Sequence, residues 1–300
     1  MRPGPGAAGW TGPEGAAAAA TSVRCPDCRC LPRMDTESAA GLEGALERGE
    51  LVVLYQPVVD LGTLRMVGAE ALLRWAHPTR GLLPPAEFIP AAEASGLIVP
   101  IGAWTLREAC QRGSVWRARR PGGSLLGVAV NVSGLQLRDP GFVAAVREEL
   151  EHSGLEPRAL LLELTETLLL EEEVVGAALE QLKGLGVRLA VDDFGTGHSS
   201  LEYLARFPLD VLKVDRSYVA LLDGQAAQHA SRAAALVRGI LLLGHSLGLR
   251  TVAEGVATPG QLRLLRKLGC QLGQGRLFEG PLDAASLEAR LGGRLGPTRW

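Results

Sequence analysis

Strand-like and helix-like patterns alternate through most of this 300-residue chain. Short apolar runs rich in Val and Leu are separated by longer segments in which apolar residues recur every three or four positions. Such alternation predicts parallel strands joined by helices that cross over in the right-handed sense. The expected strands are Leu51–Asp60, Arg65–Trp75, Leu125–Val132, Ala159–Glu163, Val187–Asp193, Leu209–Val214, Arg250–Glu254 and Gln271–Phe278.

The links between these strands decide the kind of sheet. Residues 61–64 are too few for a parallel crossover, so the first two strands should form an antiparallel hairpin. Eight strands in about 250 residues fit a modified TIM-type (β/α)8 barrel with an antiparallel first hairpin. An open doubly wound sheet is the alternative, but neither of its usual glycine-rich phosphate loops is present. Helices are expected at Gly41–Arg48, Glu87–Ser95, Ile101–Arg119, Gly141–His152, Glu171–Leu185, Ser199–Phe207, Ala226–Leu247 and Pro259–Leu268.

The two ends of the chain differ from this repeating region. Residues 1–38 are rich in Gly, Ala and Pro and are predicted to be disordered, 41–291 to form one domain, and 292–300 to be a short tail. Cys25, Cys28 and Cys30 lie in the first segment without a second ligand pair, so no zinc site is predicted there.

The composition limits which partners and which cellular compartment fit this chain. A net charge of −2 argues against a nucleic-acid polymer or an anionic membrane as a partner. No stretch has the length and apolar character of a membrane span, and the N-terminus lacks the pattern of a signal peptide. Five cysteines, an odd number, suggest a reducing compartment, and we expect a cytoplasmic protein.

Polar side chains stand where the predicted strands end. The segment VRLAVDDFGTGHSS, residues 187–200, ends an apolar run with Asp192 and Asp193, and a buried carboxylate must be hydrated, paired or bound to a cation. A lone Asp-Asp pair would more often cap a turn, but several strands here end in the same way. The other polar residues at or near strand ends are Glu70, Asn131, Glu163, Glu166, Lys213, Asp215 and Glu254.

In a β/α barrel these strand ends gather at one face, which is where active sites of such barrels lie. So many like charges repel one another unless a cation lies among them. Because the ligands are oxygen atoms, we predict hard ions, Mg²⁺ or Mn²⁺. The number of acids allows two ions about 4 Å apart, an arrangement that activates water for displacement at phosphorus.

The motifs at these positions resemble those of the EAL-domain family of cyclic di-GMP-specific phosphodiesterases. The resemblance extends in order from about Gly41 to Arg290, with family-like spacing. It implies a modified β/α barrel that hydrolyses cyclic di-GMP to linear pGpG, and a homodimer with the loop 194–200 near its interface. It is carried by EALLR (70–74), NVS (131–133), ELTE (163–166), DDFGTG (192–197), KVD (213–215), AEGV (253–256) and QG (274–275), with YQPVVD, RWAHP and EFIPAAEASGLI in support.

The resemblance also implies a role for each matching residue. Lys213 would hold the attacking water, Glu166 would steady the loop after DDFGTG, and Glu254 would be a further acid of the metal site. Gln56, Arg74 and Gln274 would contact the substrate, and the guanidinium of Arg74 suits a phosphate. The implied metal ligands are Glu70, Asn131, Glu163 and Asp192 for one ion and Asp193 for the second.

Four positions depart from the usual family pattern: His198, Ala257, Gln271 and Arg276. We expect Ala257 and Gln271 to remove negative charge near the rim, and Arg276 to add a cation near a phosphate site. A domain with little or no catalysis, acting as a cyclic di-GMP receptor or a protein-interaction module, is the alternative function. The complete set of acids and the lysine favours the enzyme. A barrel enzyme of unrelated chemistry would require the whole motif series to be coincidence.

Overall fold

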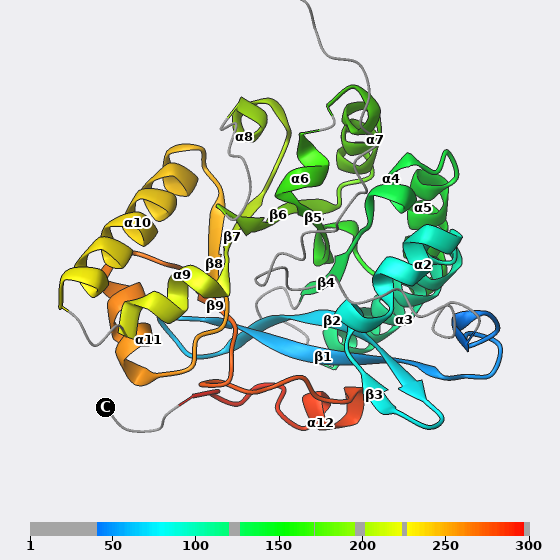
Figure 1. Cartoon of the computed structure of the whole chain (residues 1–300), viewed down its shortest axis with the longest axis horizontal. Helices are drawn as coiled ribbons and strands as arrows, with labels where there is room; N and C mark the ends of the chain where they lie inside the picture. The colour runs from blue at the N-terminus through cyan, green and yellow to red at the C-terminus, as the bar shows by residue number, and fades with distance from the viewer. Residues whose placement is uncertain (1–40, 120–126, 171, 196–201, 224–226, 297–300) are drawn as a thin grey trace, which may run out of the picture. The chain divides into compact units, whose positions relative to one another are not determined.

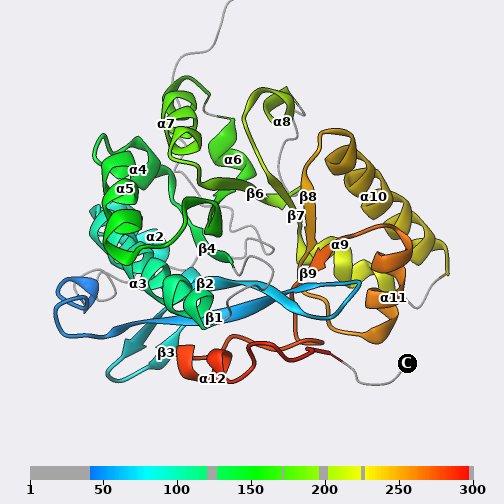
Figure 2. The same cartoon turned by 180° about the vertical axis from the view of Figure 1, so that it is seen from behind.

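The computed structural model describes residues 41–119, 127–170, 172–195, 202–223 and 227–296. The predicted disorder of residues 1–38, the three cysteines at 25, 28 and 30, and the departure at His198 lie outside these ranges. Within them, eight strands close into a barrel, and helices surround it in both views of the chain (Figures 1 and 2). The predicted fold class is confirmed.

Strand pairing closes the ring in the order β1-β9-β8-β7-β6-β5-β4-β2, and β1 pairs again with β2. Only β1 is antiparallel to its neighbours in this ring, as the short link after it requires. A ninth strand, β3 (Gly81–Leu83), extends β2 outside the ring. The barrel strands are β1 (Leu51–Asp60), β2 (Met66–His77), β4 (Gly127–Asn131), β5 (Leu160–Thr165), β6 (Arg188–Phe194), β7 (Val211–Val214), β8 (Arg250–Ala253) and β9 (Leu272–Gly273).

The helices cover the outside of this barrel. In both views α3 and α5 lie on one side of the strands and α10 and α11 on the other, while α12 contacts β1 (Figures 1 and 2). Their bounds are α2 (Ile89–Ser95), α3 (Ile98–Ala118), α4 (Gly134–Arg138), α5 (Phe142–Ser153), α6 (Glu166–Leu169), α7 (Glu172–Gly184), α8 (Glu202–Arg206), α9 (Arg216–Ala220), α10 (Ala227–Ser246), α11 (Pro259–Lys267) and α12 (Ala284–Glu288).

Several predicted elements are shorter than the sequence suggested, and two of them differ most. Residues 43–49 form turns instead of continuing a helix, and Gly44 and Gly49 adopt positive φ angles there. The expected strand at 271–278 ends after Gly273, because the chain turns at Gly275 with a φ of 152°. At the C-terminal end of the described chain, Leu295 is buried and its N–H donates to the carbonyl of Leu64, so part of the segment 292–296 also packs on the barrel.

The parallel strands β4 to β8 bury most of both faces, as parallel strands in α/β proteins do. Val130, Leu162, Val191 and Leu212 belong to the large core between strands and helices. A smaller cluster inside the barrel contains Ala190, Val211, Val252 and Leu272. Because successive side chains point to opposite faces of a strand, one residue out of two is available to the interior.

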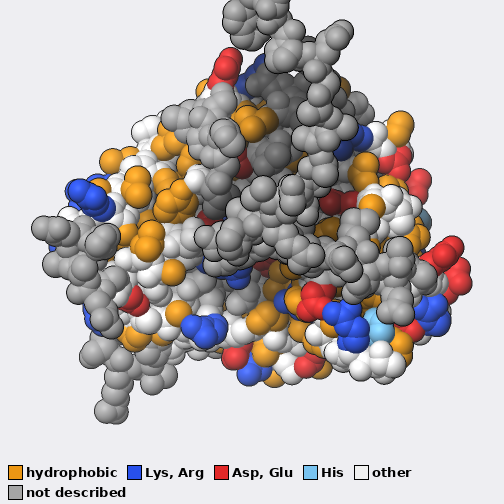
Figure 3. All heavy atoms as spheres, viewed as in Figure 1, with side chains coloured by type: hydrophobic (Ala, Val, Ile, Leu, Met, Phe, Trp, Pro, Cys, Tyr) orange, Lys and Arg blue, Asp and Glu red, His pale blue; other side chains and the backbone are white. Residues whose placement is uncertain are grey.

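One helix leaves apolar side chains uncovered. Leu236 and Leu242 on α10 are 54% and 58% exposed. Figure 3 shows hydrophobic side chains gathered on the surface over this helix. The outer side of α10 therefore exposes apolar side chains to solvent.

Gly275 provides a test of how β9 ends. A Cβ atom there would lie 2.2 Å from the carbonyl oxygen of Val256, and the φ of 152° is strained for any residue with a side chain. We expect Gly275→Ala to lower the free energy of unfolding by at least about 2 kcal/mol, measured by urea denaturation. Gly239→Ala is the matched control: Gly239 lies within α10 with open space around it, so that variant should be neutral or slightly stabilised. Equal stability of the two variants would contradict this reading of the turn.

Candidate active site

The polar residues predicted to share a rim do come together at the carboxyl ends of the barrel strands. Alternate positions on each strand point inward, so Leu161 is followed by Glu163 on β5, and Val211 by Lys213 on β7. Asp192 on β6 and Glu254, just after β8, continue the ring. β1 runs antiparallel to β2, and this register places Gln56 directly opposite Glu70.

Lys213 lies at the centre of this ring. Its side chain is only 2% exposed, and its ammonium group lies 2.6 Å from Glu254, 2.8 Å from Glu163, 3.1 Å from Asp192 and 3.7 Å from Glu70. Burial alone would lower the pKa of Lys213, but these four carboxylates raise it well above its ordinary value. Lys213 is therefore a permanent cation within the site.

One ammonium does not balance four carboxylates. Burial, reinforced by the charge of Glu70, raises the pKa of Glu163 well above its ordinary value. Burial, with the charges of Asp192 and Glu70, raises the pKa of Glu254 to about 7 against the opposing effect of Lys213. The protein thus concentrates more negative charge here than its own cation neutralises, which is the electrostatic requirement for binding added cations.

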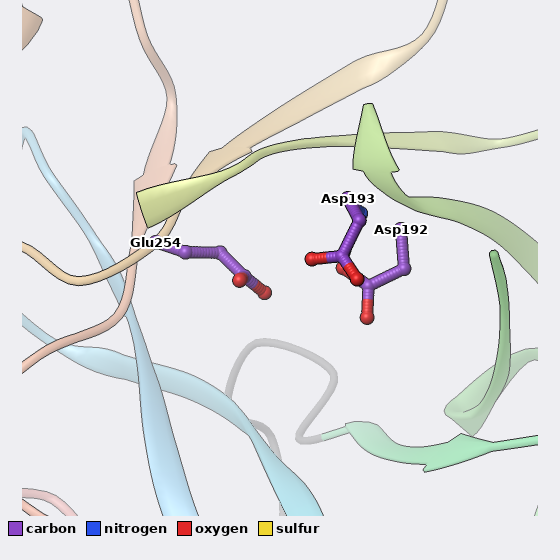
Figure 4. A group of neighbouring side chains, drawn as sticks. All are labelled: Asp192, Asp193 and Glu254. Atoms are coloured by element: carbon purple, nitrogen blue, oxygen red, sulfur yellow. The ribbon is translucent and has the colours of Figure 1, made fainter. Parts of the chain in front are cut away.

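Asp192 and Asp193 are neighbours in sequence, yet both reach the same site. Asp193 has a left-handed φ of 52°, and the pairing of β6 with β7 shifts register between Val191 and Phe194. This conformation interrupts the alternation of the strand, and Figure 4 shows the two aspartate side chains next to each other with Glu254 pointing toward them. Carboxylate oxygens of these three residues lie within 4.8 Å of one another.

Two amide side chains bind the remaining acid, Glu70, and a third contacts one of them. The Nδ2 of Asn131 donates to one carboxylate oxygen of Glu70 at 2.8 Å, and the Nε2 of Gln274 donates to the other at 2.7 Å. The same Nε2 atom lies 2.9 Å from the Oε1 of Gln56. These contacts hold the Glu70 carboxylate in one orientation beside Lys213.

Glu166 lies behind the site rather than in it. Its buried carboxylate accepts a hydrogen bond of 3.0 Å from the backbone N–H of Gly195, directly after β6. The hydroxyl of Tyr218 donates to the carbonyl of the same glycine. Glu166 is thus placed to position the backbone that follows Asp193.

A cleft of about 1170 Å³ opens above the rim and is lined by Gln56, Glu70, Asp192, Asp193, Glu254 and Gln274 together with other residues. Several of these others were not singled out from the sequence, namely Arg216, Asp223 and Gln261. They lie in or next to short helices that follow the strands, and no motif marked them. Asp215, which also lines the cleft, caps α9 through the N–H of Ser217.

Arg74 does not line this cleft, and neither do four other predicted site residues, Asn131, Glu163, Glu166 and Lys213. Arg74 lies on β2 in the same alternating series as Glu70, but its guanidinium donates to the carbonyl of Leu73 at 2.8 Å. Burial lowers the pKa of Arg74 while the charge of Glu70 acts in the opposite direction.

The departures from the family pattern fall at different ends of the barrel. Ala257 and Arg276 line the cleft, as expected. The expectation for Gln271 is wrong: it precedes β9 at the opposite end of the barrel, where its Oε1 accepts a hydrogen bond of 3.1 Å from the N–H of Thr251. A residue before a parallel strand lies away from the carboxyl-terminal rim, so Gln271 removes no charge from it.

The oxygen donors fit hard divalent ions. Carboxylates and one amide oxygen are the ligand types that Mg²⁺ and Mn²⁺ accept, and no sulfur atom is needed to complete the set. A β/α barrel with such an acidic rim belongs to the class of candidate metal-dependent barrel enzymes.

Comparison with known families makes the assignment specific. The profile of the EAL domain matches residues 39–281. The chain belongs to the EAL domain family. Over 249 residues it is 45% identical to MucR of Pseudomonas aeruginosa, a bifunctional diguanylate cyclase/cyclic di-GMP phosphodiesterase, and this match covers 83% of the chain.

Two solved structures are similar along most of the chain. The PaMucR phosphodiesterase in complex with c-di-GMP gives a TM-score of 0.78 at 43% identity, covering 84% of this chain and 99% of that one. The EAL enzyme Bd1971, bound to cAMP and cyclic di-GMP, gives 0.79 at 31% identity, covering 84% of this chain and 68% of that one. The chain spans only about a third of the length of some curated relatives, 35% of MucR and 31% of an uncharacterised protein of Sinorhizobium fredii. Across the described residues, no helix has the length and apolar character needed to cross a lipid bilayer.

The raised pKa of Glu254 predicts how stability depends on pH when no divalent ion is bound. The folded protein retains a proton on this carboxyl up to about pH 7, whereas an unfolded chain releases it near 4.5. Stability from this group is complete below pH 4.5 and is lost as the pH rises to about 7. We expect a loss of about 3 kcal/mol in this interval, measured by urea unfolding in EDTA. Glu163 acts in the same direction.

Glu254→Gln is the control for this titration, because it keeps the shape of the side chain and removes the group that titrates. The variant should show a smaller fall in unfolding free energy over the same interval. A wild-type protein whose metal-free stability is constant or rises between these pH values would contradict the assignment.

Proposed function

We propose that this chain hydrolyses cyclic di-GMP to linear pGpG with the help of two Mg²⁺ or Mn²⁺ ions. The observation that carries the proposal is the joint presence, at one barrel rim, of the full acidic set and the buried Lys213 at its centre. Similarity to MucR and to the PaMucR phosphodiesterase supports the choice of substrate. A cytoplasmic location remains part of this proposal.

The residues proposed to hold the ions divide into two groups. Asp193 would hold one ion, and Glu254 would contribute a further acid to the site. When bound, the two ions supply positive charge that favours attack of water on phosphorus. The ligands proposed for the other ion are Glu70, Asn131, Glu163 and Asp192.

Protein groups would perform the remaining steps. The Lys213 ammonium, fixed by its carboxylate neighbours, would donate a hydrogen bond to the attacking water and offset the charge that develops on the phosphate oxygens. Gln56 and Gln274 would contact the substrate from the floor of the cleft. Arg74 would bind a phosphate after exchanging its bond to the Leu73 carbonyl for one to the substrate.

The dimensions of the rim suit an extended ligand. A second cleft of about 490 Å³ is lined by Leu72, Asn131 and Asp193, and Leu72 and Asp193 also line the larger cleft. The two clefts therefore adjoin at Asp193, beside the other acids of the rim. A cyclic dinucleotide, which carries two bases and two phosphates, can place one phosphate at the acids while its bases occupy the spaces on either side.

Hydrolysis is tested by incubating the purified protein with cyclic di-GMP and Mn²⁺ or Mg²⁺ and separating the products by chromatography. We expect pGpG formation that EDTA abolishes, and a loss of at least about a hundredfold in Glu70→Ala, because a metal ligand and the orientation of its neighbours are removed. Arg158→Ala is the matched control and should keep its activity, because Arg158 forms an exposed ion pair with Glu156 ahead of β5, at the end of the barrel opposite the cleft. Unchanged hydrolysis by Glu70→Ala would contradict the two-metal assignment.

The same samples distinguish a cyclic di-GMP receptor from an enzyme. Calorimetric binding of cyclic di-GMP without any pGpG, with either ion, would identify a binding module. In that case the departures at Ala257 and Arg276, which line the cleft, become the first positions to revert.

The proposed homodimer is tested by multi-angle light scattering. The chain has a mass of 31.6 kDa, so we expect about twice that value at the concentration of the activity assay. A monomeric mass for the active protein would refute the dimer and would leave the proposed hydrolysis unaffected.

A further inference from the structure

The interior of the barrel contains a cavity of about 240 Å³, below the ring of acids and Lys213. Its walls are mainly apolar and include Leu161, Val211, Val252 and Leu272, each from a different strand. For comparison, an apolar cavity of about 150 Å³ in a protein core accepts benzene. The barrel interior therefore has room for a small organic molecule.

The two ends of this cavity differ in chemistry. At the end toward the rim, Glu163, Lys213 and Gln274 form its boundary. Lys213 donates to Glu163 and the Nε2 of Gln274 donates to Glu70, while the Oε1 of Gln274 is buried without a hydrogen-bond partner. At the opposite end, two arginines line it: Arg188 at the start of β6 and Arg250 at the start of β8. Both occupy inward positions of the strand alternation, two residues before Ala190 and Val252.

These two arginines lack the carboxylate partners that inward-facing cations usually have. The Nε of Arg188 is buried without a hydrogen-bond partner, and among the described residues no ion pair is formed by either Arg188 or Arg250. Burial and the nearby charge of Arg250 lower the pKa of Arg188, and the charge of Asp210 opposes this shift only in part. The energetic cost of this arrangement would be relieved by an anion.

The nearest acids are already engaged. Asp60, which also lines the cavity, accepts hydrogen bonds from the N–H and the hydroxyl of Thr63. Asp210 accepts hydrogen bonds of 2.8 Å from the Lys183 ammonium at both carboxylate oxygens, and a third of 2.8 Å from the backbone N–H of Leu189. Neither carboxylate forms an ion pair with the two arginines in the described part of the chain, although the charge of Asp210 acts on Arg188. Because Lys183 offsets the charge of Asp210, the two arginines leave a net positive charge at the base of the cavity against the single charge of Asp60.

We propose that this cavity binds a small organic carboxylate, with the carboxylate at Arg188 and Arg250 and the apolar body inside the barrel. Guanidinium groups pair with carboxylates through two parallel hydrogen bonds, which suits a planar anion better than a spherical one. The apolar walls select against inorganic anions, and the arginines select against neutral molecules. This site lies on the other side of the Glu163 and Lys213 layer from the rim cleft, and it does not depend on the proposed hydrolysis.

Benzoate is a suitable probe, since it joins a carboxylate to a body of benzene size. Titration of the full chain with benzoate by isothermal calorimetry should give saturable binding at one site and a matching rise in Tm. Benzyl alcohol, which lacks the charge, and inorganic phosphate, which lacks the apolar body, should each bind at least about tenfold more weakly. Benzoate that binds no better than phosphate would overturn the proposal.

Single substitutions test whether benzoate binds in this cavity. Arg250→Gln changes an exposed side chain and should fold normally, while Arg188→Gln changes the half-buried partner; each should weaken benzoate binding about tenfold. Ala129→Leu would fill the cavity from β4 and should abolish binding. Arg158→Gln is the matched control, because Arg158 is an exposed arginine paired with Glu156 outside the cavity, and it should bind as the wild type does. Equal benzoate affinity in the wild type and in folded Arg250→Gln and Ala129→Leu would place the ligand elsewhere and refute the site.

Discussion

The contact of the Lys213 ammonium with four carboxylates is the interaction on which the site depends. An isolated buried ammonium or carboxylate would be very costly, and each is tolerated here only because the others surround it. The four acids come from β2, β5, β6 and the end of β8, so the contact forms only when the barrel has closed. Lys213 thus contributes both to the stability of the closed barrel and to the charge of the site. Its removal would affect both properties.

The regular alternation of the strands extends this arrangement through the barrel. Counting inward positions from the rim, β6 presents Asp192, Ala190 and Arg188, and β8 presents Glu254, Val252 and Arg250. The barrel is therefore layered: acids and one lysine at the carboxyl ends, small and branched apolar residues in the middle, and arginines at the other end. The apolar layer separates the two charged layers, which allows them to take ligands of opposite charge without neutralising each other.

Much of the architecture could be predicted because it depends on periodicity. The hairpin of β1 and β2 followed from a link too short to cross over, and the parallel strands followed from apolar runs separated by helical patterns. The ends of elements were less predictable. The short helix α4 and the two-residue strand β9 depend on local contacts, such as the capping box of Ser133 with Gln136 and the close approach of Gly275 to Val256. The capping box joins residues three positions apart and the Gly275 approach joins distant ones, and neither leaves a period in the sequence.

The sequence by itself determined which residues could share the site, because strand ends with polar side chains must meet at one face of a closed barrel. It also determined the chemistry of their ligands, since only oxygen donors and one lysine stand there. Only the tertiary structure decided their orientation. The left-handed backbone of Asp193 brings adjacent acids together where a regular strand would separate them, Gln271 falls at the far end of the barrel, and Arg74 turns to a backbone carbonyl. These outcomes depend on backbone conformation and on neighbours distant in the sequence, which the order of residues does not express.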